Sequence, residues 1–250
     1  MAFFNTTSLL TKETSIQLFD NFQELTYKIT TKTDGNIAFH VGDNTNDVLQ
    51  RHAKLAQSLH YDPNNLIHMK QIHSDRIHRV TQEDTFEAPH EVDALITNIK
   101  GKALMVMVAD CTPLLAYDPK HKVIAVAHVG RAGAFLNIVS KLIDTFINHY
   151  NSNPQEIYVM SAPSIASSCY EVSHAIVQEA QEYNYGFAIE QKDNRYYLDI
   201  RAIISHQLLE KGILPQNTQL SSICNCCHTD RYYSYRKEGQ TGRFGAILML

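Results

Sequence analysis

Three side chains that could bind a metal ion occur at widely separated points of the chain. His73 follows the tripeptide KQI, Cys111 follows the dipeptide AD, and His128 follows the apolar run 123–127. Zinc binds nitrogen and sulfur ligands, and a catalytic zinc keeps one open position beside three protein ligands. Two imidazoles and one thiolate would suit such a site, although their separations match no short metal motif. A packed, hydrogen-bonded core role therefore stays open for each of the three.

A second group of possible ligands is the run CNCCH at 224–228. A structural zinc site needs ligands from two separated segments, and no second Cys-x-x-Cys or His-x-x-x-His partner stands nearby in the sequence. The adjacent Cys226 and Cys227 also point in different directions on any regular backbone. We therefore expect these residues to pack in a tight turn.

Other chemistry is open to the same residue types. Cys111 could be a thiolate nucleophile paired with His73 or His128, with Asp110 orienting the base. The segment 230–237 mixes cations and tyrosines, a composition that suits a phosphate group or a stacked base as well as a solvated strand. Residue types alone do not separate nucleophilic catalysis from metal binding.

Short apolar runs must position these side chains. They lie at 103–109, 113–117 and 123–127, and the sequence DPKH between the last two favours a turn. Such unbroken runs indicate strands that are buried on both faces. The segment 66–80, rich in isoleucine and histidine, indicates a strand and a turn that carries Gln71 and His73.

Helical periodicity is clear in two further segments, 46–59 and 135–147, and Asn44 or Thr45 can cap the first of them. Later segments continue the alternation: strands at 156–160, 196–200 and 245–250, and helices at 172–183 and at 201–211, where Gly212 ends the helix. Strands that alternate with helices predict an α/β core. Without repeats or a long linker, one domain over residues 1–250 is the simplest organisation.

Composition excludes several classes of protein. The 250 residues carry 22 basic and 26 acidic side chains, a net charge of −4, so no basic excess points to nucleic acid. No apolar run approaches the roughly 18 residues of a membrane helix. The first residues lack the pattern of a secretory signal, and an odd number of cysteines, five, argues against a disulfide framework. We expect a cytoplasmic protein with reduced thiols.

Five parts of the chain resemble the YfiH or laccase-domain family, whose members are also described as multicopper polyphenol oxidase-like proteins, peptidoglycan editing factors or purine nucleoside phosphorylases. These parts are NIAFHVGD at 36–43, KQIH at 70–73, ADCTP at 109–113, AHVG at 127–130, and the pair 162–172 and 221–250. Residues 1–30 are the least well covered. The resemblance implies an α/β (α+β) single-domain sandwich of two mixed β-sheets flanked by helices.

The resemblance also implies a metal and an activity. His73, Cys111 and His128 would bind zinc, with copper as the less favoured ion. The enzyme would cleave adenosine, inosine, guanosine and methylthioadenosine with inorganic phosphate and would deaminate adenosine. Zinc activates water for attack at C6 of adenine, and Asp110 is the nearest candidate in sequence for proton transfer.

Phosphorolysis requires groups that hold phosphate against a cation-like ribose. We assign this role to Arg236 and Arg243, and we expect Asn36 and His40 to line the pocket. The chain departs from the family at two places. It has AHVGRAG at 127–133 where the family usually has AHAGWRG, and Lys32 stands where an arginine is usual. Lysine lacks the bidentate grip of arginine, so Arg131 is a candidate to supply anion binding.

Three alternative functions follow from the same resemblance. The first is an editing hydrolase that removes a wrong amino acid from a peptidoglycan precursor, using the zinc site or Cys111. The second is copper-dependent phenol oxidation, which ranks lower because the sequence has no clustered His-x-His pattern. The third is a homologue whose catalysis was lost with the divergent segment 130–132. The sequence leaves the oligomeric state open.

Overall fold

The computed structural model describes residues 17–250, so the expectation about a secretory signal lies outside the described residues. Two larger sheets form the centre of the protein. The six-stranded sheet has the order β12-β8-β6-β7-β4-β3, and the four-stranded sheet has the order β1-β13-β5-β2. The strands of the first sheet are β3 (Ile77–Arg79), β4 (Ala94–Thr97), β6 (Thr112–Asp118), β7 (Val123–Val129), β8 (Tyr158–Ser161) and β12 (Thr218–Gln219). Those of the second are β1 (Thr26–Ile29), β2 (Leu66–Ile67), β5 (Ala103–Val108) and β13 (Phe244–Met249).

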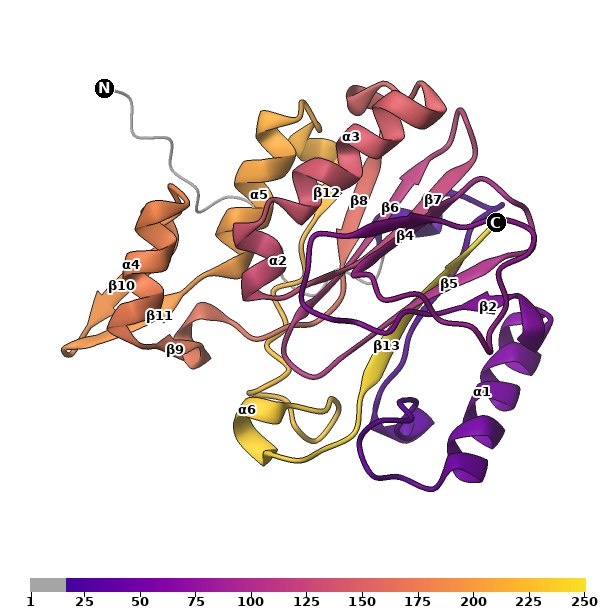
Figure 1. Ribbon diagram of the computed structural model, residues 1–250, viewed down its shortest axis with the longest axis horizontal. Coiled ribbons are helices and arrows are strands. Elements are labelled where there is room, and N and C mark those ends of the chain that lie inside the picture. The colour runs from indigo at the N-terminus through magenta and orange to yellow at the C-terminus, as the bar shows by residue number, and fades with distance from the viewer. Residues whose placement is uncertain (1–16) are drawn as a thin grey trace.

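Helices cover the outer faces of both sheets (Figure 1). Helices α3 (Ile138–Tyr150) and α5 (Ile200–Glu210) pack on the six-stranded sheet, and α1 (Thr45–Leu59) packs on the four-stranded sheet. The facing surfaces of the two sheets form a core of their own, in which Val106 of β5 and Leu115 of β6 take part. Because each central strand is covered on both sides, its sequence is an unbroken apolar run.

The α/β sandwich expected from the sequence is confirmed, with one addition. A third sheet, of order β10-β11-β9, stands at one end of the molecule beside α4 (Figure 1). Its strands are β9 (Glu171–Val172), β10 (Ile189–Lys192) and β11 (Arg195–Leu198), and α4 spans His174–Glu182. The strand predicted at 196–200 ends two residues early because the Asp199 side chain accepts a hydrogen bond from the Ala202 amide and caps α5.

The helix predicted from the periodicity over 135–147 is divided in the structure. A short helix, α2 (Arg131–Phe135), directly follows Gly130, and α3 begins after Asn137, whose φ of 65° interrupts the helical backbone. The predicted strand and turn at 66–80 is likewise two short strands, β2 and β3, joined by an irregular segment. No helix within residues 17–250 combines the length and apolar character needed to span a membrane.

Candidate metal centre and active site

Sheet topology brings Cys111 and His128 together. Strands β6 and β7 are antiparallel neighbours, so the start of β6 lies beside the end of β7, and Pro113 pairs with His128. Cys111 immediately precedes β6. The segment between β2 and β3 then places His73 against this edge, with the rings of His73 and His128 4.7 Å apart between centroids. One ligand atom from each of the three residues lies within 4.8 Å of the others.

A buried carboxylate that the sequence analysis did not identify holds this arrangement. Asp93 precedes β4, which pairs with β7, and its Oδ1 lies 2.8 Å from Nδ1 of His128. The same carboxylate accepts hydrogen bonds from the backbone amides of His73 (3.0 Å) and Ser74 (2.6 Å). With Nδ1 engaged, Nε2 of His128 is left for a metal ion or a proton. The signal available in the sequence was an acidic residue directly before the apolar run 94–96.

The backbone at His73 has an uncommon conformation. His73 has a φ of 58°, in the left-handed region that is uncommon for a residue with a side chain. The hydrogen bonds from its amide and from the Ser74 amide to Asp93 hold this turn in place. Asp93 therefore orients two of the three donors, one through its ring and one through its backbone.

Electrostatics favour a charged pair at the centre. Burial opposes the thiolate of Cys111, but the positive charge of His128 and hydrogen bonds from His128 and His73 lower the pKa of Cys111 to about 6. Burial likewise opposes the imidazolium of His128, whereas Cys111 and Asp93 raise the pKa of His128 to about 9. In the absence of a cation, a thiolate and an imidazolium therefore face each other near neutral pH.

Gly130 leaves the space that the donors occupy. A Cβ atom at this position would lie 3.0 Å from Sγ of Cys111 and 3.1 Å from Cδ2 of His73. Its φ of −86° is open to any residue, so the requirement is for room and not for backbone freedom. The donor group therefore depends on the absence of a side chain at Gly130.

These donors fit a single thiophilic or borderline metal ion. Two imidazole nitrogens and one sulfur are ligands that both zinc and copper accept. Their exposure rises from the buried His128 through the half-buried Cys111 to the exposed His73, so one side of the group faces solvent. Three donors with an open side match the ligand number of a catalytic site better than that of a closed structural site.

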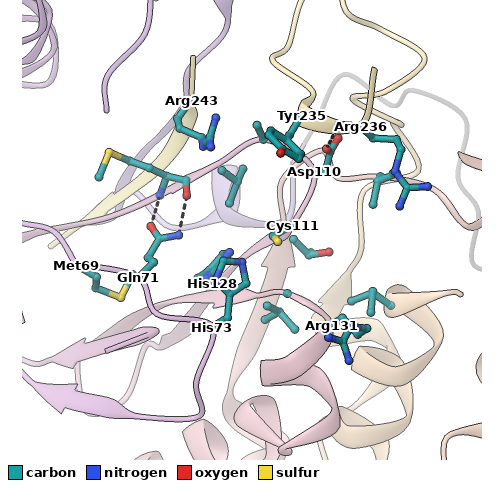
Figure 2. A pocket seen from close by; sticks show the side chains of 18 of the residues that line it. Met69, Gln71, His73, Asp110, Cys111, His128, Arg131, Tyr235, Arg236 and Arg243 are labelled. Atoms are coloured by element: carbon teal, nitrogen blue, oxygen red, sulfur yellow. Dashed lines mark hydrogen bonds between the residues drawn. The ribbon is translucent and has the colours of Figure 1, made fainter. Parts of the chain in front are cut away.

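The open side faces a cavity of about 690 Å³, within the usual size range for small-molecule sites. Figure 2 shows the three donors grouped in this cavity, with Arg243, Tyr235 and Arg236 above them in that view. Apolar and aromatic side chains supply much of the remaining lining: Met69, Met107, Ile165, Tyr170 and Ile200.

Asp110 lines the cavity, but its carboxylate is already engaged. Oδ1 accepts hydrogen bonds from Oγ of Ser234 (2.6 Å) and from Nδ2 of Asn225 (2.9 Å), and Oδ2 accepts one from the amide of Arg236 (2.7 Å). Its backbone φ of 101° marks a sharp turn directly before Cys111. The contacts made by Asp110 thus join the C-terminal segment to the candidate metal centre, a role that the sequence analysis did not include.

The three arginines expected to bind substrate all line the cavity, yet they differ in pairing. Arg131 forms an ion pair with Glu179 of α4. Arg236 donates to the carbonyl oxygen of Glu171 (3.0 Å), and Arg243 donates to those of Thr241 (2.8 Å) and Gly242. Within residues 17–250, neither Arg236 nor Arg243 forms an ion pair with a carboxylate.

Of the other two residues expected to line the pocket, one lines the cavity and the other does not. His40 lies on the cavity, and burial together with the nearby charge of Arg243 lowers its pKa. Asn36 is buried behind the lining: its Oδ1 accepts hydrogen bonds from the amides of Ala38 and Arg243, and its Nδ2 donates to Asp43. Because these contacts occupy its side chain, Asn36 supports the position of Arg243 and does not face a ligand.

Lys32 also lies away from the cavity. Its Nζ forms an ion pair of 2.5 Å with Glu238 and donates to the carbonyl oxygen of Thr229. Lys32 therefore joins two segments of the chain and contributes no charge to the cavity lining.

Sequence comparison relates most of the chain to one family. The family model described as "Multi-copper polyphenol oxidoreductase laccase" matches residues 27–250. A purine nucleoside phosphorylase of Corynebacterium glutamicum is 32% identical over 217 residues, which cover 86% of this chain and 86% of that protein. The purine nucleoside phosphorylase YlmD of Bacillus subtilis is 28% identical, with 93% of this chain and 91% of that protein covered.

Solved structures agree with this relationship. The hypothetical protein YfiH of Bacillus licheniformis superimposes with a TM-score of 0.86 at 28% identity, over 93% of this chain and 94% of that chain. YlmD from Geobacillus stearothermophilus gives a TM-score of 0.86 at 26% identity, over 91% of this chain and 92% of that chain. The fold and the shared sequence thus point to the same group of proteins.

Proposed function

Because this chain belongs to the family described as multi-copper polyphenol oxidoreductase laccase, several of whose members are named purine nucleoside phosphorylase, we propose that it is a zinc-dependent purine nucleoside phosphorylase. Inorganic phosphate would replace the base at C1′ of the ribose: the bond from C1′ to N9 breaks, a bond from C1′ to a phosphate oxygen forms, and the free purine leaves with a proton. The observation that carries this proposal is the placement of three metal donors and two unpaired arginines around one cavity.

We assign the metal ion to His73, Cys111 and His128. When bound, zinc supplies a Lewis acid that stabilises negative charge on an oxygen atom of the reactants. Asp93 keeps the His128 ring oriented by its hydrogen bond of 2.8 Å to Nδ1. A carboxylate behind a metal-binding histidine both fixes the ring and increases its basicity.

We assign the phosphate to Arg243 and Arg236. Both arginines line the cavity. The Nη1 atom of each donates hydrogen bonds only to backbone carbonyl oxygens. A phosphate group would add charge-assisted hydrogen bonds to these guanidinium groups. Arg131 is a weaker candidate because Glu179 already neutralises it.

We assign the purine to the remaining lining. Tyr235 offers an aromatic face, and Met69 and Met107 offer apolar contact of the kind that purine rings bind. The ring of Tyr170 instead carries the Arg236 guanidinium, 5.2 Å from its centroid. The lowered pKa of His40 leaves its imidazole uncharged at neutral pH, able to donate one hydrogen bond and to accept another. His40 is therefore our candidate for the hydrogen bond to the departing base.

The same site is proposed to deaminate adenosine. In that reaction water replaces the amino group at C6, giving inosine and ammonia. The reaction needs no phosphate, so the phosphate-binding arginines should affect it less than they affect phosphorolysis. Adenosine, inosine, guanosine and methylthioadenosine are the substrates to compare.

The direct test is product analysis with purified, zinc-loaded protein. Incubation with adenosine should give adenine and ribose 1-phosphate only when phosphate is present, and inosine with or without phosphate. Arg243→Ala should raise the KM for phosphate by about tenfold or more, the size of one lost charge-assisted hydrogen bond, and should leave deamination nearly unchanged. Arg131→Ala is the matched control, with a smaller effect expected. Absence of any product from the four nucleosides, in protein that holds zinc, would contradict the proposal.

The copper-loaded protein is a second arm of the same test. The family description names polyphenol oxidation, so a phenol and dioxygen should be offered to the copper form in parallel. Phenol oxidation that exceeds nucleoside turnover would replace phosphorolysis as the proposed activity.

A further inference from the structure

A second group of sulfur atoms lies beside the wall of the cavity. One Sγ atom from each of Cys169, Cys224 and Cys227 lies within 4.8 Å of the other two, and those of Cys169 and Cys227 are 3.4 Å apart. The tight turn expected at 224–228 is present, with the Cys227 amide bonded to the carbonyl oxygen of Cys224. The partner from a separated segment, which the sequence did not reveal, is Cys169.

Pairing between two chain segments explains why Cys169 lies beside the turn. Ser164 and Cys224 form an isolated β-bridge, which places the segment after Ser164 alongside the turn. The Ala166 amide donates a hydrogen bond of 3.3 Å to Sγ of Cys224. Hydrogen bonds from amides to sulfur are a recurrent feature around metal thiolates because they stabilise the negative charge.

The spacing of the sulfur atoms suits an ion better than a disulfide. Sulfur atoms that each lie about 2.3 Å from one tetrahedral zinc ion are about 3.8 Å from one another. The three observed atoms converge at separations of this order. A disulfide would join two of them and leave the third unused. Cys226, between the two ligands of the turn, shares a small buried cluster with Ile165 and Cys224, but its sulfur is not part of the group of three.

We propose that Cys169, Cys224 and Cys227 form a second metal site, which binds zinc through three sulfur ligands. The exposed side of Cys227 leaves the fourth position to water. Cys224 and Cys227 have the Cys-x-x-Cys spacing that recurs in structural zinc sites. The site is separate from the first metal centre, since none of its three cysteines lines the cavity described above.

The ion would connect two segments, of which one lines the cavity at Tyr170 and the other supports a lining residue, Asp110. Cys169 lies next to Tyr170, and its carbonyl oxygen and that of Glu171 accept hydrogen bonds from Arg236. At the other end, Asn225 lies within the turn and donates to Asp110. An ion held by both segments would therefore fix the position of Arg236 relative to Asp110. The open position of this ion would not face the cavity, because none of its three ligands lines it. The expected role is therefore structural support of the wall.

Elemental analysis of fully reduced, zinc-equilibrated protein tests this inference. The wild-type chain should hold two zinc ions, and Cys169→Ser and Cys227→Ser should each hold one. Cys111→Ser should also hold one, and the double variant Cys111→Ser/Cys227→Ser should hold none. Cys226→Ser is the matched control and should keep both ions. In the cobalt-substituted Cys111→Ser protein, the sulfur-to-metal absorption bands should persist, and they should vanish in the double variant.

Three results would overturn the second site. They are a wild-type chain that holds no more zinc than Cys227→Ser, a Cys226→Ser variant that loses an ion, and a Cys169–Cys227 disulfide that forms in place of metal binding. Cys227 is exposed, so Cys227→Ser should fold even if substitution of the buried Cys224 prevents folding, and circular dichroism checks this. Metal counting does not depend on nucleoside turnover, so an inactive protein with two ions would contradict only the proposed phosphorylase function.

Discussion

Two groups of residues that we propose to bind metal ions contain sulfur, and they differ in almost everything else. The first, His73, Cys111 and His128, combines two nitrogen donors with one sulfur and faces a cavity. The second consists of three cysteines that lie outside the lining of that cavity. We call them the histidine centre and the cysteine cluster.

The surroundings of the two groups explain the difference in their expected roles. The histidine centre depends on a buried carboxylate, Asp93, and on the space left by Gly130. Both features fix the direction of a donor while leaving one side open, as a reacting centre requires. The cysteine cluster has a backbone amide on one sulfur and joins two distant segments. Such an arrangement favours a clamp.

The largest contrast is expected from removing one sulfur at each group. Cys111→Ser should lower kcat/KM for phosphorolysis on the order of 10³-fold, the scale of losing a group that acts directly in the reaction. Cys227→Ser should keep most of the activity, but should lower the Tm by about 5–10 °C when free zinc is about a hundred times its Kd. Steady-state kinetics and thermal unfolding measure the two effects. Equal losses of activity in both variants would remove the distinction between a reacting centre and a clamp.

A smaller but more specific effect is expected at Gly130. Gly130→Ala adds a methyl group 3.0 Å from Sγ of Cys111 and 3.1 Å from the His73 ring, so the donors must shift by a few tenths of an ångström. A misplacement of about 1 Å can cost about 100-fold in rate. For this smaller shift we expect kcat to fall by about 10- to 100-fold, with little change in the far-UV circular dichroism spectrum.

Gly186→Ala is the control for the added methyl group. Its Cβ would meet only Cγ of Gln181, at 3.5 Å, an ordinary contact. Its activity and zinc content should equal those of the wild type. Full activity in Gly130→Ala would mean that the donors do not need the geometry described here.

Much of the fold was predictable because strands that are buried on both faces have unbroken apolar sequences. The runs at 103–109, 113–117 and 123–127 became β5, β6 and β7, since each of these strands is covered by a sheet on one side and by helices or a sheet on the other. Strands of two or three residues, such as β2 and β12, are too short to show any periodicity. The break between α2 and α3 was missed because the apolar spacing continues across Asn137.

The sites were less predictable because their residues meet only through long-range pairing. His73, Cys111 and His128 were identified as possible ligands, and the family resemblance, not their spacing, linked them. Asp93 was missed because a single acidic residue before a strand resembles a solvated loop residue. Cys169 lies close to Cys224 because of one β-bridge, that between Ser164 and Cys224, which no local sequence pattern predicts.

Asp93 allows the contrast to be examined without touching a ligand. Asp93→Asn keeps the shape of the side chain but removes the charge that faces Nδ1 of His128. Loss of such a carboxylate typically weakens metal binding or activity by about 10–100-fold. We expect this loss at the histidine centre and no change in zinc binding by the cysteine cluster, as measured by chelator competition.

Asp118 provides a matched aspartate. It is buried, its Oδ2 lies 2.8 Å from Nδ1 of His121, and its Oδ1 accepts a hydrogen bond from the Lys120 amide. It stands at the opposite end of β6 from Cys111, so Asp118→Asn should lower stability and leave zinc affinity unchanged. If Asp118→Asn weakened zinc binding as much as Asp93→Asn does, the loss would reflect general destabilisation.

The smallest expected effect concerns the charge state of Cys111 in metal-free protein. Its pKa of about 6 means that the thiolate predominates above pH 6 and that protonation removes it as the pH falls through this value. The rate at which Cys111 is alkylated, followed by mass spectrometry of its peptide, should therefore fall to half of its high-pH value near pH 6. Cys226, whose pKa is raised mainly by burial, should react slowly across the same range.

His128→Gln removes the positive charge that faces the Cys111 thiolate. The variant should raise the pH at which Cys111 alkylation is half-maximal by about one pH unit or more, which lowers the thiolate population about tenfold between the two midpoints. An unchanged midpoint would mean that the imidazole does not stabilise the thiolate, and the histidine centre would then lose the electrostatic property that separates it from the cysteine cluster.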